Sequence, residues 1–331
     1  MPAERAALVT GGAGYIGSHV VWALADAGWR VVVIDDLSAG RWVTLPEGVR
    51  LVVGDVGAPD PLRRLLREER VSVVLHFAGS IVAPESVARP LLYYRNNTAS
   101  SLALLEACLE AGIETLVFSS TAAVYGDPER VPVAEDAPLR PLTPYGRSKL
   151  MTEQMLADAS AAHGLRYVAL RYFNVAGADP AGRTGAATPG ASNLIKAVCE
   201  AALGIRPGIT IFGDDYPTDD GTCVRDFIHV ADLAHAHARA VEHLAGGGES
   251  LTLNCGYGRG FSVREVIATL TRLLGRPLDV VTAGRRPGDP AAVVADNARI
   301  LVRLGWRPRH DDLEQILRDA LAGERRLRGL H

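Results

Sequence analysis

The sequence predicts a doubly wound α/β fold: a parallel sheet with helices on both faces, joined to a smaller C-terminal α/β lobe that would hold the substrate. Three observations predict it. Over the first 175 of 331 residues, short runs of valine, isoleucine and leucine alternate with amphipathic stretches. The runs are nearly continuous, which is typical of parallel strands buried on both faces. After residue 175 the composition shifts to Gly, Ala, Pro and Thr.

The apolar runs give the expected strands of the larger domain: Ala6–Thr10, Arg30–Ile34, Val49–Val53, Val71–His76, Thr115–Ser119 and Tyr167–Tyr172. The helices expected between them have apolar residues at helical spacing: Ile16–Ala27, Pro61–Arg70, Asn97–Ala111 and Arg147–His163. Later elements are a strand at Leu251–Cys255, which should return to the sheet, and helices at Ser262–Leu274 and Asp311–Leu327. The expected division is 1–175 plus about 229–255 for the larger domain, and 176–228 with 256–331 for the lobe.

The composition excludes several classes of protein. Apolar residues make up 48% and charged residues 22% of the chain, and the net charge is −3. No basic stripe suggests a nucleic acid partner, and no run of about 18 apolar residues suggests a membrane span. The four cysteines form no CxxC pair, which favours free thiols in a reducing compartment. We therefore expect a cytoplasmic protein.

A glycine-rich loop follows the first expected strand. Gly11, Gly14 and Gly17 stand between that strand and a helix, where glycines let the backbone approach a pyrophosphate and the helix N-terminus supplies amide donors. Asp35 and Asp36 end the second strand about 20 residues beyond the loop. A carboxylate there accepts from ribose hydroxyls and repels a 2′-phosphate, so the pattern predicts a Rossmann-type domain that binds NAD rather than NADP.

Two further strand ends should line the same cofactor. Asp55 ends the third strand, and the segment 76–79 (HFAG) ends the fourth. Ligands of open parallel sheets bind at the carboxyl ends of the strands.

Tyr145 and Lys149 form a YxxxK pair at the start of an expected helix, where the i, i+4 spacing places both side chains on one face. A nearby ammonium and a positive nicotinamide would both favour the phenolate, so Tyr145 could act as general base and acid on a sugar hydroxyl. The chain has only two lysines, Lys149 and Lys196, which makes the pair informative. Upstream, the fifth strand ends in Ser119–Thr121, where a hydroxyl could reach the reacting oxygen.

These residues resemble a known family, the extended short-chain dehydrogenases/reductases, through the segments GGAGYIGSH, HFAG, SSTAAVYGD, PYGRSK and RYFNVAG. Later segments resemble members of that family that invert C4 of a UDP-hexose: ESVARPLLYYRNN, FGDDYPTDDGTCVRDFIHV and RRPGD. The resemblance covers most of the chain. It implies an NAD-dependent epimerase that interconverts UDP-galactose and UDP-glucose through a transient 4-keto sugar.

The resemblance also assigns residues. The catalytic positions would be Thr121, Tyr145 and Lys149. The residues around NAD would be Gly11, Gly14, Tyr15, Ile16, Gly17, Asp35, Asp36, Asp55, Val56, Phe77, Ala78, Gly79, Asn96, Lys149 and Phe173. Besides Thr121 and Tyr145, the residues around the UDP-sugar would be Asn174, Asn193, Leu194, Arg225, Arg286, Asp289 and Val293. Guanidinium groups suit a diphosphate because they donate two parallel hydrogen bonds.

Two positions depart from the commoner pattern. Thr121 stands where many relatives have serine, which preserves the hydroxyl chemistry. Val293 falls near a position that is often tyrosine in epimerases limited to simple hexoses. The smaller side chain leaves room for an N-acetyl group, so UDP-N-acetylhexosamines are a further expected substrate.

Rival functions stay open at this point. UDP-pentose and UDP-glucuronate epimerases share these motifs. Nucleotide-sugar dehydratases carry an acidic residue just after the strand-five threonine, whereas Ala122 and Ala123 follow Thr121 here. A non-catalytic NAD-sensing regulator would commonly have lost the tyrosine–lysine pair.

No metal site is expected. His235 and His237 would diverge on a helix and are interpreted as a solvated face, and the aspartates of 214–220 as a turn-rich acidic loop. The apolar stripes of Asn97–Ala111 and Arg147–His163 match helices that pair across a dimer in the family, so we expect a homodimer.

Overall fold

The computed structural model describes residues 5–186, 193–286 and 288–330. Seven strands build its larger sheet: β1 (Ala6–Thr10), β2 (Arg30–Asp35), β3 (Arg50–Val53), β4 (Val71–His76), β5 (Thr115–Thr121), β6 (Arg166–Tyr172) and β10 (Leu251–Cys255). They pair in parallel in the order β10-β6-β5-β4-β1-β2-β3. The order reverses between β1 and β4, which is where doubly wound sheets bind ligands. The predicted fold class is therefore confirmed.

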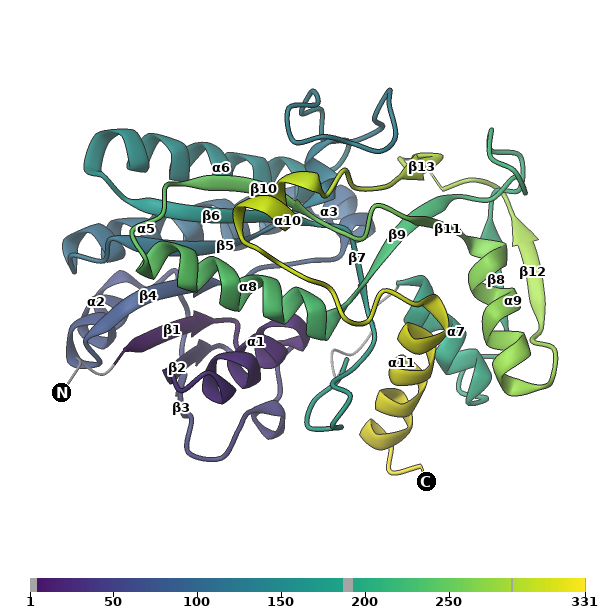
Figure 1. Ribbon diagram of the computed structural model, residues 1–331, viewed down its shortest axis with the longest axis horizontal. Coiled ribbons are helices and arrows are strands. Elements are labelled where there is room, and N and C mark those ends of the chain that lie inside the picture. The colour runs from purple at the N-terminus through teal and green to yellow at the C-terminus, as the bar shows by residue number, and fades with distance from the viewer. Residues whose placement is uncertain (1–4, 187–192, 287, 331) are drawn as a thin grey trace.

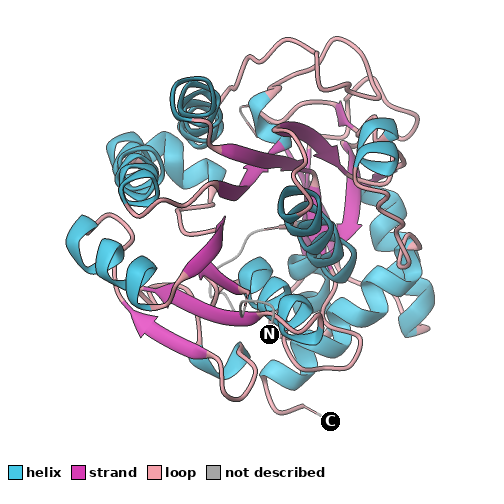
Figure 2. Ribbon diagram, turned by 60° about the vertical axis from the view of Figure 1, so that its left-hand side comes forward, coloured by secondary structure: helices cyan, strands magenta, loops and turns pink. Residues whose placement is uncertain are grey.

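Helices cover both faces of this sheet (Figures 1 and 2). Those of the larger part are α1 (Tyr15–Asp26), α2 (Pro59–Glu68), α3 (Ala83–Ala88), α4 (Pro90–Tyr93), α5 (Ser100–Glu110), α6 (Pro144–His163), α8 (Val230–Ala245) and α10 (Ala298–Arg303). Shorter helical turns are η1 (Trp42–Thr44), the π-helix η2 (Tyr94–Ala99) and η3 (Ala122–Val124). One apolar cluster joins the sheet to α1 and α8, and a second joins it to α2, α5 and α6.

The alternation of side chains along the strands explains the two clusters. Ala7 and Val9 of β1 point to the α1–α8 face, whereas Leu8 between them points to the α2–α5–α6 face. Val33 and Val32 of β2 divide in the same way. A strand that buries both faces needs apolar residues at every position, which is why these runs are continuous in the sequence.

Smaller sheets follow β6. Their strands are β7 (Asn174–Ala176), β8 (Ile209–Phe212), β9 (Val224–His229), β11 (Gly260–Ser262), β12 (Val280–Ala283) and β13 (Ala292–Val293). Strand β9 pairs with β7, β11 and β13, and β8 pairs with β12. The helices α7 (Leu194–Ala202), α9 (Val263–Leu274) and α11 (Leu313–Leu327) pack together around a third apolar cluster. Figure 1 shows this part beyond the carboxyl ends of the large sheet.

Several element bounds differ from the prediction by one to three residues, and three of the differences lie next to the candidate site. Strand β5 continues past Ser119 to Thr121. Helix α6 begins at Pro144 rather than Arg147, because Thr143 caps it through its hydroxyl and proline suits the first helical turn. The helix expected over 97–111 is divided into η2 and α5.

One segment lies with a different part than expected. Residues 298–306 were placed in the smaller lobe, yet α10 contacts β10 and Trp306 is fully buried in the cluster beside α8. The Trp306 indole donates to the carbonyl of Asp232 at 3.0 Å. The large apolar surface of Trp306, Ile300 and Leu304 finds its cover on the large sheet, which the local sequence pattern does not reveal.

No helix in the described ranges is both long and apolar enough to cross a bilayer.

Candidate active site

The loop between β1 and α1 is shaped by close backbone approach. Gly11 has φ +67°, and a Cβ there would lie 2.6 Å from the amide nitrogen of Ala78, at the end of β4. A Cβ on Gly17 would lie 2.3 Å from the Gly11 carbonyl oxygen. Gly14 is the N-cap of α1; no side chain caps that helix in the described chain, and its first turn has no acidic residue. The helix N-terminus therefore presents amide donors to an anion.

Asp35 fixes this loop. The buried carboxylate accepts from the backbone amides of Ala13 at 2.9 Å and Leu37 at 2.8 Å. Burial raises the pKa of Asp35, and the two amides oppose that shift. Asp36 is exposed and accepts from the amide and hydroxyl of Ser38. Both acids lie at the carboxyl end of β2, where a ribose would reach them.

His76 ties three elements together behind the loop. Its Nδ1 lies 2.7 Å from the Thr10 hydroxyl on β1, and its Nε2 lies 2.9 Å from the Ser101 hydroxyl on α5. Burial lowers the pKa of His76 to about 3, with Lys149 adding to the shift. A neutral imidazole therefore holds the end of β4, from which Phe77, Ala78 and Gly79 continue.

Asn97, which the sequence analysis did not single out, holds the segment after β4 next to the expected cofactor residues. It is buried, accepts from the amide of Ser80 at 2.7 Å, and donates to the Ser80 carbonyl and the Ser148 hydroxyl at 3.0 Å each. The expected residue, Asn96, donates to the Ser80 hydroxyl at 3.1 Å. Both asparagines lie in η2, and π-helical turns are frequent at functional sites. The adjacent pair of asparagines was the signal available in the sequence.

The remaining cofactor candidates surround the same edge. Tyr15 donates from its hydroxyl to the carbonyl of Gly177 at 2.7 Å, which links α1 to the start of the smaller part. Asp55 is exposed and accepts from the amide of Gly57, whereas Val56 is buried. Phe173 is buried between β6 and β7.

The structure brings Thr121, Tyr145 and Lys149 together. Thr121 ends β5, and Tyr145 and Lys149 lie on the first turns of α6, with only 8% of Tyr145 and 3% of Lys149 exposed. Burial raises the pKa of Tyr145, and a hydrogen bond with Thr121 opposes that rise. Burial lowers the pKa of Lys149 to about 8.

The Lys149 ammonium is engaged by the chain around it. It donates to the carbonyl of Ser119 at 2.9 Å and lies 5.0 Å from the ring centre of Phe118, while burial and the Thr121 hydrogen bond are the causes of the Tyr145 pKa shift. Desolvation outweighs the single favourable hydrogen bond, so the tyrosine is a weaker acid than in water.

Charged groups from two segments meet on the substrate side. Arg225 of β9 lies 3.6 Å from Asp289, which also pairs with Arg286 at 2.9 Å. Val293 of β13 is paired in register with Arg225. The Arg286 guanidinium lies 4.5 Å from the ring centre of Phe212. Two guanidinium groups beside a single carboxylate leave donors for a diphosphate.

The other substrate candidates lie on neighbouring elements. Asn174 begins β7, directly after Phe173. Asn193 caps α7 by accepting from the amide of Lys196 at 2.8 Å, and Leu194 is the first residue of that helix. The side chain of Asn193 is thus engaged by its own helix.

His237 corrects the expectation of a solvated histidine pair. It is fully buried in α8, donates from Nδ1 to the carbonyl of Leu233 at 2.9 Å, and its ring centre lies 4.8 Å from that of Phe77. Burial lowers its pKa to about 4. His235 on the same helix is half-buried. The alternation of alanine and histidine hid the helix face that packs on the sheet.

The acidic loop is held by its own turn. Asp220 accepts from the amide and hydroxyl of Thr222, at 2.9 and 2.6 Å, and from the hydroxyl of Ser262 at 2.5 Å. Asp215 pairs with Arg285 at 2.7 Å. These partners engage two of the four aspartates of the loop, Asp215 and Asp220.

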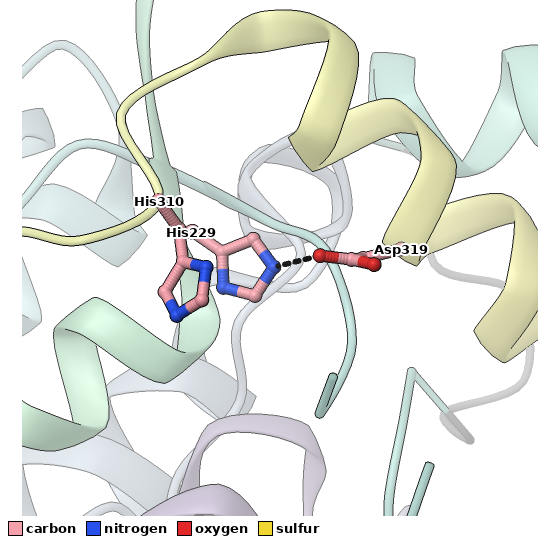
Figure 3. A group of neighbouring side chains, drawn as sticks. All are labelled: His229, His310 and Asp319. Carbon is pink, nitrogen blue, oxygen red and sulfur yellow. Dashed lines mark hydrogen bonds and ion pairs between the residues drawn. The ribbon is translucent and has the colours of Figure 1, made fainter. Parts of the chain in front are cut away.

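Within the described residues, His229, His310 and Asp319 bring three potential metal-ligating side chains together (Figure 3). His229 Nδ1 accepts from the amide of Ala231 at 3.0 Å, which places the single proton of a neutral ring on Nε2, facing Asp319 at 3.2 Å. His310 stacks on His229 at 4.7 Å. The His229 nitrogen that faces the group is thus a donor rather than a ligand, and the geometry is that of a helix cap bonded to α11.

The strands of the large sheet are parallel, and their order reverses between β1 and β4, where the glycine loop lies. The chain also has a buried tyrosine–lysine pair. Together these features define a dinucleotide-dependent enzyme of the Rossmann class. Comparison with known sequences is specific on this point: the model of the NAD dependent epimerase/dehydratase family matches residues 7–256. The chain belongs to that family.

Individual relatives are similar over nearly the whole chain. A UDP-glucose 4-epimerase of Azospirillum brasilense is 64% identical over 97% of this chain and 92% of its own length. The crystal structure of UDP-glucose 4-epimerase from Brucella ovis in complex with NAD is 44% identical, with a TM-score of 0.93 over 96% of this chain and 98% of its own. That of the Stenotrophomonas maltophila enzyme with bound NAD and formylated UDP-arabinopyranose is 40% identical, with a TM-score of 0.95 over 98% and 99%.

Proposed function

We propose that this chain is a UDP-hexose 4-epimerase that binds NAD and interconverts UDP-galactose and UDP-glucose. The observation that carries the proposal is the buried set Thr121, Tyr145 and Lys149 at the carboxyl edge of the sheet, in a chain with the likeness just described. The two methyl side chains after Thr121, Ala122 and Ala123, supply no acid for a dehydratase. Activity of this kind would place the protein in galactose metabolism.

The residues next to β1 and β4, where the strand order reverses, fit NAD. The uncapped N-terminus of α1 would hold the pyrophosphate. Gly11 and Gly17 allow the loop to be tight, because a Cβ at either position would collide with backbone atoms. The acids that end β2 would hold the adenosine ribose. When bound, NAD supplies reversible hydride acceptance from C4 of the sugar. Asn96 and Asn97 of η2 both bond to Ser80 after β4, and Asn97 also donates to Ser148 of α6, the helix that carries Lys149.

Side chains of the protein transfer the proton. Tyr145 takes the proton of the C4 hydroxyl, and Thr121 bridges the phenol and the reacting oxygen. Lys149, held by the Ser119 carbonyl, lies where it would meet the nicotinamide ribose. The 4-keto sugar rotates while Arg225 and Arg286 hold the diphosphate, and Tyr145 then returns the proton. Asn174, Asn193, Leu194 and Asp289 complete the proposed substrate contacts.

The test is direct. Purified protein is incubated with UDP-galactose, with and without added NAD, and UDP-glucose is separated from UDP-galactose. We expect conversion, and a Tyr145→Phe variant that retains NAD but converts at least about a hundredfold more slowly, because general acid–base catalysis contributes that much. No conversion by the wild type with NAD present would transfer the proposal to UDP-pentoses or UDP-uronates, which the same separation tests. A Tyr145→Phe variant that kept its cellular role would favour the NAD-sensing regulator.

A second candidate substrate class is the UDP-N-acetylhexosamines. Val293 is buried next to Phe173 and Ala122, beside the strand that carries Arg225, and its side chain is smaller than an aromatic ring. We expect turnover of UDP-N-acetylglucosamine and its loss in Val293→Tyr with UDP-galactose turnover kept. If the wild type fails on N-acetylated sugars while it turns over UDP-galactose, this candidate is wrong.

We further propose a homodimer through α5 and α6. Leu102 of α5 is 47% exposed, Met151 of α6 is 40% exposed, and Leu91 of the neighbouring α4 is 75% exposed. Light scattering of Leu102→Glu/Met151→Glu against the wild type tests it, and an unchanged mass would count against this face. The buried free thiols of Cys108, Cys199, Cys223 and Cys255 favour action in the cytoplasm.

The smaller part, proposed as residues 176–228 and 256–331 without the segment 298–306 that packs on the large sheet, would hold the UDP moiety over the NAD-binding domain.

A further inference from the structure

A buried ion pair lies directly behind the proposed catalytic set. Glu153 of α6 and Arg171 of β6 have side chains that are 7% and 6% exposed. The pair is bidentate, with Arg171 Nη2 at 2.6 Å from Oε2 and Nε at 3.0 Å from Oε1. Neither residue is among those assigned to NAD or the UDP-sugar above.

The pair holds the Thr121 segment on both sides. The Ser120 hydroxyl, one residue before Thr121, donates to the Glu153 carboxylate. Four residues after Thr121, the Tyr125 hydroxyl accepts from Arg171 Nη1 at 3.0 Å and donates to Asn254 at 2.6 Å. The turn of η3 between these contacts begins with Thr121 as its N-cap, whose hydroxyl accepts from the amide of Ala123 at 3.1 Å.

The same pair holds the helix that carries the other two groups. Glu153 is four residues after Lys149 and eight after Tyr145, so all three lie along one face of α6. One ion pair thus joins β5, β6 and α6, which are the elements that position Thr121 and Tyr145. Arg171 Nη1 also donates to the carbonyl of Glu135 at 3.0 Å, which fixes the guanidinium from the opposite side.

The energetics favour a geometric role. A buried ion pair adds little to stability compared with apolar residues of similar volume, because both charges lose their water. Its value here is that bidentate hydrogen bonds define distance and angle more tightly than apolar contact does. We propose that Glu153 and Arg171 are positioning residues that set the hydrogen bond between Thr121 and Tyr145. The inference rests on the proposed function, in which Tyr145 is the base.

The consequence is a specific pH signature. The Thr121 hydrogen bond opposes the burial-driven rise of the Tyr145 pKa. If Glu153→Gln lets β5 and α6 separate slightly, that bond weakens and tyrosinate forms at higher pH. The variant should therefore lose kcat by about tenfold to a hundredfold, as small misplacements do, with the KM for UDP-galactose changed by less than about threefold. The acidic limb of its pH–kcat profile should move to higher pH.

A matched control separates positioning from folding. Glu69 is 7% exposed and its carboxylate pairs with Arg30 and Arg50 at the amino end of the sheet, away from Thr121. Glu69→Gln should leave the pH profile unchanged even if it unfolds more easily. The double variant Glu153→Leu/Arg171→Met should regain stability relative to Glu153→Leu alone, because an apolar pair replaces an unpaired charge. It should not regain kcat.

Two results would overturn the inference: an unshifted pH–kcat profile in a folded Glu153→Gln variant, or recovery of kcat together with stability in the double variant. Tyrosinate absorbance of the NAD-bound wild type and variant gives a readout that needs no turnover. If the wild type converts no UDP-galactose, the proposed function fails, while a higher ionisation pH in the variant would still support the positioning role.

Discussion

Tyr145 and Lys149 lie in one buried region, and burial moves their ionisation in opposite directions. The pKa of the phenol rises and the pKa of the ammonium falls to about 8. Both shifts favour uncharged groups in the ligand-free chain. A positively charged nicotinamide next to the phenol would reverse the balance for Tyr145, because an opposite charge within about 4–6 Å stabilises the ionised form.

We expect bound NAD to lower the pKa of Tyr145 and so favour its ionised form, which acts as the base. In the NAD-free protein the pKa of Tyr145 should lie above that of a free tyrosine because the phenol is buried, and added NAD should lower it. Tyrosinate difference absorbance over a pH series measures this, with Tyr145→Phe identifying the signal. Equal titration curves with and without NAD would contradict the assignment of Tyr145 as a base tuned by the cofactor.

Sequence reasoning found the identity of these side chains but not the contacts of the Lys149 ammonium. The YxxxK spacing on a helix locates Tyr145 and Lys149, whereas the direction in which Lys149 points depends on the Ser119 carbonyl and the Phe118 ring. Asn97 was missed for a similar reason. Its contact with Ser80 depends on the extra residue per turn of η2, which no apolar period reveals.

The β1–α1 unit has the closest backbone approach in the proposed cofactor site. Gly17 lies in the first turn of α1, and the space where its Cβ would stand is occupied by the carbonyl of Gly11. A methyl group cannot be accommodated unless the helix moves away from the strand. The approach of helix and loop is thus set by backbone contact.

Replacement of Gly17 by alanine should destabilise the NAD-free protein by about 1–3 kcal/mol, as overpacking does, and weaken NAD binding further. Urea unfolding and NAD titration measure the two effects. Gly284→Ala is the control, because a Cβ at Gly284 meets nothing within 4 Å and its φ is not positive. Equal stability of the two variants would show that the loop yields easily.

Element by element, the sequence located the large-sheet strands well because apolar residues predominate in them, with continuous runs in β1, β2 and β4. The bounds that moved were set by hydrogen bonds, as at Thr143, whose cap starts α6 three residues earlier than its apolar pattern. The position of α10 is set by tertiary contacts. Nothing in residues 298–303 distinguishes a helix that covers β10 from one that covers the smaller sheets.

At the scale of the molecule, three buried histidines set the acid limit of stability. Burial lowers the pKa of His19 to about 4, of His76 to about 3 and of His237 to about 4. In the unfolded chain each would titrate near 6.5. Below that pH the unfolded chain binds more protons than the folded one, so stability is complete above pH 6.5 and is lost as pH falls toward the folded-state values.

Each histidine should therefore cost roughly 2 kcal/mol of unfolding free energy between pH 7 and pH 5, since one pKa unit corresponds to about 1.4 kcal/mol. Urea unfolding at both pH values measures the total. His237→Gln should reduce the loss, whereas a change at the exposed His163 should leave it as in the wild type. A wild type equally stable at both pH values would contradict this account.

The path of the chain between the large sheet and the smaller sheets also limits how this protein can be truncated or recombined with a relative. The chain leaves the large sheet after Tyr172, enters β7, returns along α8 and β10, leaves again at β11, and comes back once more at α10. A fragment that stops before α8 would lack both a sheet-covering helix and the edge strand. Swapping substrate specificity between relatives by exchanging one contiguous block would therefore split the scaffold. A graft that works must carry at least two separate stretches of sequence while α8 and β10 stay with the host.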